Sequence, residues 1–481
     1  MLFQVALYGL VYLLCFVVCA KVASRQARQF VLLAGSYALY LTWGVWFAAV
    51  LLSSTIINFL VGQWIRRRPE GFVLSLGILL NLLLLGTFKY LPEVAIVLPF
   101  SSLQKFSHLV MPLGMSFWTF QAMSYLFDQY RGEELDPSFV EFATFMAFFP
   151  VVISGPVCRM TEMLPQFRSQ TQISWDNVGK GFRRIATGIL MVQLARLLGQ
   201  GVLGGDGVSS GFDHAMRWGA TDVWFLSIGY GLQLFFDFAG YTHIVLGAAQ
   251  GLGFILPENF DLPFRSTTPS LFWTRWHMSL SFWIRDYVFL PMAMIRREVW
   301  WRTFALFTSM VMFGVWHKGT ILFVLWGGYH GVLLILHRLV QQCERKWNFD
   351  NSTPIWKPIS WLCTMLLISL GWIFFRANSL GQARQMLSTI LVPANYQVQN
   401  LSGSFYWLVI VLAVAYVCVV VLGKALESSC AETAVQNTVI AALVRLQWYW
   451  IPPIYVTVLV IVVIMAAGSG SNAAAFMYRG F

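Results

Sequence analysis

Long apolar runs, separated by short segments with charges, prolines and glycines, extend over almost the whole chain. Many approach the roughly 20 residues that an α-helix needs to cross the hydrocarbon core of a membrane. Of the 481 residues, 58% are hydrophobic and 11% are charged, whereas soluble domains carry about 25% charged residues. Because backbone polar groups in lipid must be satisfied within the chain, such runs fold as helices. The sequence therefore predicts an all-α polytopic membrane protein.

We expect about eleven transmembrane helices. The run 30–62 is too long for one span, and Thr42-Trp43-Gly44 is expected to turn it into a hairpin. Basic clusters at Lys21–Arg28 and Arg66–Arg68 flank this hairpin, so the positive-inside rule places them in the cytoplasm and the N-terminus outside. The other expected spans are residues 3–20, 72–88, 181–198, 223–251, 304–316, 321–339, 361–375, 407–422, 439–450 and 454–467.

The chain has no internal repeat and no separate soluble region, so residues 1–481 are expected to form one membrane domain. Within it we distinguish N-terminal helices at 1–165, a catalytic core at 180–340 and C-terminal helices at 355–481. Ala383–Leu391 is expected to be a short amphipathic helix. Repeated halves are typical of secondary transporters, so their absence argues against a transporter or flippase, which stays the alternative class.

The positive charge does not indicate a nucleic-acid-binding protein. The formal net charge is +11, but Lys and Arg are spread between apolar runs and form no basic stripe. The seven cysteines lack metal-ligand spacing, so no metal site is expected. The glycines between Gly199 and Gly207 lack the Lys-Ser/Thr of a phosphate-binding loop, and we expect no bound cofactor.

The section 257–294 differs from the expected spans because it is both aromatic and charged. Arg275, His277, Arg285 and Asp286 fall close together within it. So many ionisable groups are not tolerated on a helix that faces lipid. They are typical of short re-entrant or interfacial helices that line a cavity.

His330 is the first candidate for chemistry. It lies in the apolar run 321–336, where a histidine is costly unless something pairs with it or uses it. Gly327, Gly328 and Gly331 remove side-chain bulk around it, which allows another backbone or a substrate to approach closely. We interpret His330 as a candidate reactive centre.

His317 and His277 are the other two candidates. On one unbroken helix, the 13 residues between His317 and His330 would span about 20 Å. The two histidines could not then touch one carbonyl group, although Gly319-Thr320 offers a break. His277 comes from the charged section and can approach His330 only through tertiary folding.

Chemistry on a hydroxyl acceptor needs a base that is neutral near pH 7 and can take a proton, and histidine suits this role. Asp286 or Asp237 is a candidate to orient an imidazole. The chain has no Gly-x-Ser-x-Gly motif, so a serine hydrolase is unsupported. From the residues alone, a catalytic role and a polar packing role both stay open for the histidines.

At these residues the chain resembles the membrane-bound O-acyltransferase (MBOAT) family. It is most similar to the bacterial branch of alginate O-acetyltransferases and teichoic-acid D-alanyl transfer proteins. The motifs that carry the resemblance are PLGMSFWTFQAMSY at 112–125, PENF at 257–260, FWTRWHMSLSFWIRDY at 272–287, Trp316-His317, WGGYHG at 326–331 and GWIFFRA at 371–377.

The resemblance implies that His330 is the catalytic histidine and His277 the second catalytic one. It implies a ring of tilted helices around a central funnel or tunnel in the bacterial cytoplasmic (inner) membrane. There a cytoplasmic donor, acetyl-CoA or an acyl carrier thioester, would meet an acceptor on the outer side. An extracytoplasmic esterase-like partner protein would then modify a polysaccharide acceptor. The residues expected to support the reaction or line the tunnel are His317, Lys318, Trp276, Arg275, Asp286, Asp237 and Tyr329.

Two positions depart from the family pattern. Lys318 stands where relatives usually have glycine, and His243 stands where many alginate-type relatives have an acidic residue. Lys318 is expected to reach lipid headgroups, to attract an anionic donor or to act on His317. The departures leave two reactions open, namely acetyl transfer to an exported polysaccharide and D-alanyl transfer from a carrier protein to teichoic acid.

Overall fold

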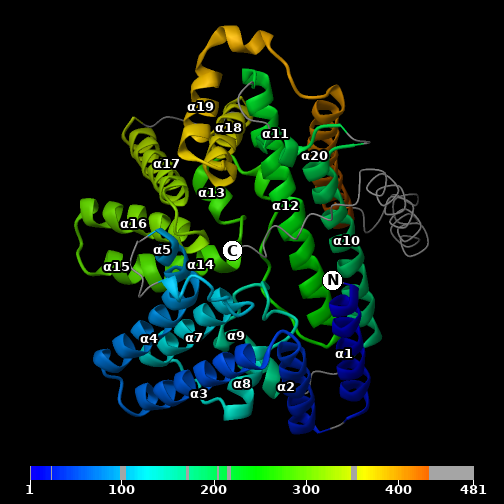
Figure 1. The fold of residues 1–481 in the computed structure, drawn as a ribbon, viewed down its shortest axis with the longest axis vertical. Helices are drawn as coiled ribbons and strands as arrows, with labels where there is room; N and C mark the ends of the chain where they lie inside the picture. The colour runs from blue at the N-terminus through cyan, green and yellow to red at the C-terminus, as the bar shows by residue number, and fades with distance from the viewer. Residues whose placement is uncertain are drawn as a thin grey trace. The chain divides into compact units, whose positions relative to one another are not determined.

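The computed structural model describes residues 2–22, 24–97, 104–169, 173–202, 205–213, 218–347 and 355–432. Regular structure in these ranges is helical (Figure 1). The one extended pairing within them is an isolated antiparallel bridge between Phe260 and Trp276. The all-α prediction is therefore confirmed for the described part of the chain.

The helices form two compact units. The first unit comprises residues 1–185, 242–259 and 278–292, and the second comprises 186–241, 260–277 and 293–481. The chain passes from one unit to the other within three helices: α10 (Trp175–Gln200), α12 (Ala220–Gly251) and α15 (Leu290–Met294).

The first unit contains a helical hairpin at residues 25–67, and its turn at Gly44 confirms the turn predicted from the sequence. Ser24 caps the first of its helices by accepting from the backbone N–H of Ala27, and Gly44 makes the turn at φ 147°, which favours glycine. The helices are α1 (Leu2–Lys21), α2 (Arg25–Leu41), α3 (Val45–Arg67), α4 (Gly71–Lys89), α5 (Leu91–Val97), α7 (Met115–Tyr130), α8 (Phe139–Ala147), α9 (Met160–Arg168), α14 (Met278–Ile284) and the π-helical turn η2 (Arg285–Phe289).

Small residues let α3 and α4 pack closely on α7. A Cβ on Gly62 of α3 would lie 2.2 Å from a ring carbon of Tyr125 on α7, and a Cβ on Gly77 of α4 would lie 2.7 Å from Leu126. Such close approach is typical of helix packing in membranes, where association depends on van der Waals contact.

The second unit contains the remaining described helices. They are α11 (Val208–Asp213), η1 (Pro263–Arg265), α13 (Pro269–Trp273), α16 (Val299–His317), α17 (Ile321–Lys346), α18 (Trp356–Arg376), α19 (Leu380–Leu391), η3 (Pro393–Gln397) and α20 (Gly403–Glu432). The short amphipathic helix expected at Ala383–Leu391 is confirmed as α19. It begins three residues earlier because the Ser379 hydroxyl caps it by accepting from the backbone N–H of Gln382.

Helices α16 and α17 form an antiparallel pair around the expected break at Gly319-Thr320. Two glycines bring their backbones together. A Cβ on Gly314 would lie 2.1 Å from the carbonyl oxygen of Phe323, and a Cβ on Gly327 would lie 2.3 Å from that of Met310. Because α17 begins anew at Ile321, His330 lies about 14 Å along this helix and His317 is the last residue of α16.

Six of the described helices are long and apolar enough to cross a membrane, namely α3, α4, α12, α17, α18 and α20 through Val420. A shorter apolar helix, Leu7–Lys21, belongs to α1. The chain is thus a multi-pass membrane protein. The expected spans at 439–450 and 454–467 lie outside the described residues.

The section 257–294 consists of short helices, as expected. η1, α13, α14, η2 and α15 are each three to seven residues long. Pro263 and Pro269 occupy the first turns of η1 and α13, where proline is tolerated. The π-helical turn η2 follows α14 directly. Such turns are rare in proteins, and those that occur often lie at functional sites.

Candidate functional site: the buried histidines

The three candidate histidines are all buried in the second unit. Their exposed fractions are 0% for His330, 1% for His277 and 4% for His317. They come from α17, from the segment between α13 and α14, and from the end of α16. Burial of this degree is unusual for histidine and calls for a stated role.

Aromatic rings surround His330. Its ring centre lies 5.0 Å from Trp326, 5.1 Å from Trp273 and 5.4 Å from Tyr329. Trp326 and Tyr329 lie on α17, four residues and one residue before His330. Trp273 is the last residue of α13. We call His330, Trp273, Trp326, Tyr329 and Phe313 the His330 aromatic shell.

Four polar atoms of this shell have no hydrogen-bond partner among the described residues. They are both ring nitrogens of His330, Nδ1 and Nε2, and the indole Nε1 atoms of Trp273 and Trp326. Buried polar atoms are paired in the great majority of cases, and each unpaired one costs about 1–3 kcal/mol. The shell therefore presents an imidazole and two N–H donors that no described residue engages.

Gly371 holds the space beside His330 open. A Cβ at this position of α18 would lie 2.6 Å from Nε2 of His330 and 3.4 Å from the Tyr329 ring. The Tyr329 hydroxyl donates to the carbonyl oxygen of Leu367 on α18 at 2.8 Å. Helix α18 is thus fixed against α17 at a distance that only glycine permits.

Shared aromatic neighbours connect the three histidines. Trp326 packs against both His330 and His317, whose ring lies 5.4 Å away. Phe313 stacks on His317 at 5.3 Å and lies 6.4 Å from His277. The structure therefore places all three imidazoles around one aromatic group.

His277 has a strained backbone. Its φ of 45° lies in the left-handed region, which is uncommon for residues other than glycine. The residues beside it are held by the Phe260–Trp276 bridge and by the backbone N–H of Asp261, which donates to the carbonyl of Arg275 at 3.1 Å. Burial lowers the pKa of His277 to about 3, so this imidazole is neutral at pH 7.

Three other predicted residues lie in the same unit. Trp276 is buried and stacks on Phe272 at 5.3 Å. Arg275 forms an ion pair with Asp261 at 3.8 Å. Asp237 is buried on α12. None of these side chains has a ring contact, ion pair or hydrogen bond to His330 among those the structure describes.

Asp286 belongs to the first unit and binds arginines. Its carboxylate lies 2.7 Å from Arg159 and 2.6 Å from Arg285, and its backbone oxygen accepts from Arg131 at 2.6 Å. Burial would raise the pKa of Asp286, but the hydrogen bonds from Arg285 and Arg159 bring it below its usual value. The hypothesis that Asp286 orients an imidazole therefore lacks support, because the guanidinium groups occupy both of its oxygens.

The two residues that depart from the family pattern lie in different units. Lys318 follows α16 in the second unit and is exposed. His243 lies on the part of α12 that belongs to the first unit and is half-buried.

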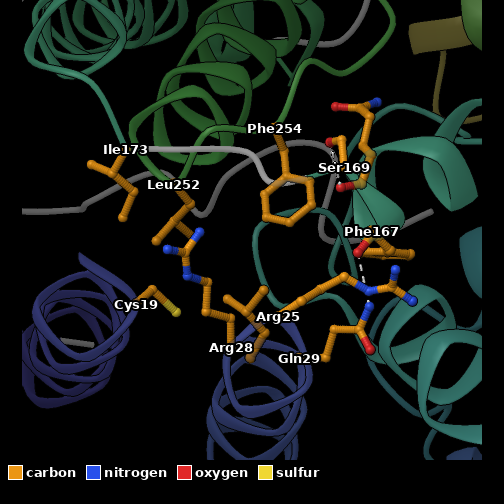
Figure 2. A pocket seen from close by; sticks show the side chains of 11 residues that line it. Cys19, Arg25, Arg28, Gln29, Phe167, Ser169, Ile173, Leu252 and Phe254 are labelled. Carbon is orange, nitrogen blue, oxygen red and sulfur yellow. Dashed lines mark hydrogen bonds between the residues drawn. The ribbon is translucent and has the colours of Figure 1, made fainter. Parts of the chain in front are cut away.

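A small pocket in the first unit collects other polar side chains. Its volume is about 30 Å³, and Arg25, Arg28 and Gln29 of α2 line it (Figure 2). These groups are engaged within the protein, since Arg25 binds Glu141 at 3.2 Å and Gln29 donates to the carbonyl of Phe167 at 2.9 Å. The pocket therefore differs from the His330 aromatic shell, in which the imidazole nitrogens and the two indole N–H groups have no partner among the described residues.

Sequence reasoning missed Trp273, Phe313 and Gly371. Trp273 and Gly371 both lie in motifs that the sequence displays, and a glycine inside an apolar span is a signal of close approach. Phe313 carries no such signal. Among the described residues, no group of three or more His, Cys, Asp or Glu side chains is arranged to hold a metal ion.

These observations define a class: a helical, multi-pass membrane protein with a buried imidazole whose nitrogens no described residue engages. Comparison with known proteins identifies the family. The sequence model of the membrane-bound O-acyltransferase family, MBOAT, matches residues 99–376, a range that includes all three histidines. The chain belongs to this family.

Several curated relatives agree. The probable alginate O-acetylase AlgI of Pseudomonas putida is 31% identical over 395 residues, covering 79% of this chain and 78% of its own length. The peptidoglycan O-acetyltransferase of Helicobacter pylori is 30% identical and covers 74% and 72%. The teichoic acid D-alanyltransferase of Streptococcus thermophilus is 30% identical over 51% of this chain and 61% of its own length. The protein is an enzyme that transfers an acyl group to a hydroxyl.

Proposed function

We propose that His330 is the general base of an acyl transfer to a hydroxyl group. The supporting observation is its complete burial with two ring nitrogens that no described residue engages. A histidine in this state is available to take a proton, and general-base catalysis of this kind contributes about 10²–10⁴ in rate.

The step balances as follows. A nitrogen of His330 takes the proton of the acceptor hydroxyl while the oxygen attacks the thioester carbonyl of the donor. The tetrahedral intermediate then collapses, the C–S bond breaks, and the thiolate that leaves takes the proton from the imidazolium. The products are an ester and a free thiol, and the histidine is restored.

The indole N–H groups of Trp273 and Trp326 would supply hydrogen bonds to the oxyanion of that intermediate. The centres of the Trp273 and Trp326 rings lie 5.1 and 5.0 Å from the centre of the His330 ring. No described residue accepts a hydrogen bond from either indole N–H group. Donors that are fixed before reaction stabilise developing charge at little reorganisation cost. His277, neutral and held in a strained backbone, is the second histidine of the reaction, and His317 supports Trp326.

The donor is an acyl thioester that arrives from the cytoplasm, either acetyl-CoA or an acyl carrier protein. The enzyme acts in the cytoplasmic membrane of a bacterium, and an extracytoplasmic esterase-like partner completes O-acylation of an exported polysaccharide. The acetyl group is preferred over D-alanine because the alginate O-acetylase of Pseudomonas putida matches 79% of this chain, whereas two teichoic acid D-alanyltransferases match 51% and 64% of it. A central tunnel would let donor and acceptor meet at His330.

The test uses membrane vesicles with wild-type enzyme, a His330→Ala variant and a His337→Ala control. His337 lies on the same helix, α17, two turns further along and outside the aromatic shell. Radiolabelled acetyl-CoA is supplied at the cytoplasmic face, and polymer acylation and polymer export are both measured. We expect the His330 variant to lose acylation by at least about 100-fold with unchanged export, and the control to keep both. Loss of export alone would support a transporter.

A further inference from the structure

His277 lies directly before α14, the seven-residue helix Met278–Ile284. The residue at such a position usually caps the helix, because its side-chain oxygen accepts from backbone N–H groups of the first turn. Capping residues have an extended backbone, whereas the φ of His277 is 45°, in the left-handed region. Another residue supplies the acceptors for the first turn of α14.

That residue is Asn259, in the segment that follows α12. Its backbone carbonyl accepts from the N–H of Met278 at 2.9 Å, and its side-chain amide oxygen accepts from the N–H of Ser279 at 3.3 Å. The same amide oxygen accepts from the Ser279 hydroxyl at 2.6 Å. Asn259 therefore satisfies both backbone N–H groups that directly follow His277.

The Asn259 side chain is itself held in place. It is fully buried, with an exposed fraction of 0%, and its amide N–H donates to the Thr242 hydroxyl on α12 at 3.4 Å. The Ser279 hydroxyl that bonds to it also accepts from the backbone N–H of Val157 at 3.0 Å. Each of these contacts joins residues of the first unit. The start of α14 is thus attached to a fixed point.

The residue before His277 is held as well. Phe260, the neighbour of Asn259, forms the antiparallel bridge with Trp276. His277 therefore lies between two anchored residues, Trp276 and Met278. A left-handed backbone in a residue other than glycine persists where the surrounding structure imposes it in this way, and such residues are frequent at active sites.

The consequence concerns the His277 ring. Its centre lies 4.6 Å from Phe238 on α12, and 6.4 Å from Phe313 and 6.3 Å from Trp316 on α16. Because Asn259 takes the capping role, the imidazole is not required at the backbone of α14. It packs instead in the aromatic group that the three histidines share.

We propose that Asn259 is a positioning residue for His277. By capping α14 in place of His277, it fixes the left-handed backbone that brings the imidazole to Phe313. This inference rests on the proposed function, in which His277 is the second histidine of the reaction. Asn259 acts on the rate of acyl transfer through the placement of His277 and makes no contact with donor or acceptor.

The first experiment tests the backbone of residue 277 without turnover. Glycine adopts a positive φ at no steric cost, whereas alanine is strained there. In lipid nanodiscs, full-length His277→Gly should therefore melt about 2–4 °C above His277→Ala. When Asn259→Ala is added to both, the difference should disappear, because the backbone is no longer held. Asn259→Leu, which fills more of the space without the amide, gives the same comparison if the alanine variant does not fold.

A glycine advantage of equal size with and without Asn259 would overturn the proposal. The absence of any glycine advantage in the presence of Asn259 would overturn it too, because the backbone of residue 277 would then not be held in the left-handed region.

The second experiment measures kcat and KM for a thioester donor per folded molecule. Asn259→Ala should lower kcat about 10- to 100-fold with KM within about twofold, and Asn259→Asp, which keeps an acceptor for Ser279, should recover most of the rate. In a His277→Ala background, Asn259→Ala should cause no further loss, because both changes act through one imidazole. Ser36→Ala removes another buried hydrogen bond of the first unit and, as the control, should leave kcat unchanged.

An equal loss of kcat from Asn259→Ala in the wild-type and His277→Ala backgrounds would overturn the proposal and make Asn259 a structural residue. The two experiments separate this inference from the proposed function. If His277→Ala kept the wild-type kcat while the melting temperatures behaved as expected, the proposed role of His277 in the reaction would fail, and the capping role of Asn259 would stand.

Discussion

Two groups of buried polar side chains in this protein differ in how they are paired. In the His330 aromatic shell, the imidazole nitrogens and the indole N–H groups of Trp273 and Trp326 lack partners among the described residues. In the first unit, the Tyr287 hydroxyl lies 2.8 Å from the buried carboxylate of Asp128. The polar atoms named in the first group therefore have no partner among the described residues, whereas those in the second group are hydrogen-bonded to each other.

The Tyr287 charge cluster is held together by several such contacts. The guanidinium groups of Arg131 and Arg159 each lie 5.1 Å from the centre of the Tyr287 ring, a distance at which cation–π attraction operates. Arg159 also binds Asp286 at 2.7 Å. The cluster consists of Asp128, Arg131, Arg159, Arg285, Asp286 and Tyr287.

If the proposed function holds, the paired groups serve the fold and the unpaired groups around His330 serve the reaction. Paired charges hold α7, the segment before α9, and the turn η2 together within one unit. A buried polar atom without a hydrogen-bond partner lowers the stability of the fold. Proteins keep such destabilising groups mainly in active sites, where activity requires them. The following predictions are ordered from the largest expected effect to the smallest, and each can break this distinction.

Gly371→Ala should have the largest effect, because the added Cβ would lie 2.6 Å from Nε2 of His330 and displace the imidazole. We expect acyl transfer to fall by about 100-fold, since small misplacements of a catalytic group cost this much. The measurement is the initial rate of transfer from a thioester donor in nanodiscs. Unchanged transfer by this variant would show that the nitrogen is not used.

Gly327→Ala and Gly328→Ala form a matched pair on α17. A Cβ on Gly327 would lie 2.3 Å from the carbonyl oxygen of Met310, whereas one on Gly328 would make only ordinary contacts of 3.6 Å with Phe307. The first variant should lose about 2–4 kcal/mol of stability, and the second should gain up to about 1 kcal/mol from better helix propensity. Thermal unfolding of both variants tests this. Equal melting temperatures would show that α16 and α17 are not in backbone contact.

Tyr287→Phe tests the charge cluster. Loss of the hydroxyl leaves the Asp128 carboxylate without its donor, and we expect stability to fall by about 1–2 kcal/mol. Transfer per folded molecule should stay within about twofold of wild type, because the cluster serves the fold. Activity and melting temperature are measured on the same preparation. A large loss of activity with unchanged stability would show that the cluster takes part in the reaction.

The smallest expected effect is on the pH dependence of stability. Burial raises the pKa of Asp128 from 3.8 to about 6, although the hydrogen bond from Tyr287 opposes this. An acid whose pKa is higher in the folded state stabilises the fold when protonated, so stability should fall as pH rises from about 4 to 6 and level off above. Asp128→Asn should lack this component. Parallel curves of melting temperature against pH for the two proteins would contradict it.

Much of the fold could be predicted because hydrophobic length and punctuation are local signals. The hairpin turn at Thr42-Trp43-Gly44 and the short helices of 257–294 follow directly from the sequence. The π-helical turn Arg285–Phe289 does not, because no local pattern distinguishes it from the end of an α-helix. The start of α19 at Leu380 was missed by three residues, since the capping Ser379 lies outside the amphipathic pattern.

The candidate site was only partly predictable. His330 is conspicuous as an ionisable residue in an apolar run, but its neighbours Trp273 and Gly371 come from α13 and α18 and meet it only through tertiary folding. Tertiary folding also explains why the arginine contacts of Asp286 were not predicted. Its partner Arg159 lies 127 residues earlier in the chain, and sequence alone gives no sign that they meet.

The most direct test of the central claim, that His330 is retained for chemistry at a cost to the fold, is the His330→Leu variant. Leucine fills a similar volume and removes both unpaired nitrogens. Melting temperature and acyl transfer are measured together on the purified enzyme in nanodiscs. We predict an unchanged or higher melting temperature with transfer abolished. A melting temperature lowered by several degrees, with transfer retained, would contradict the claim and make His330 a structural residue.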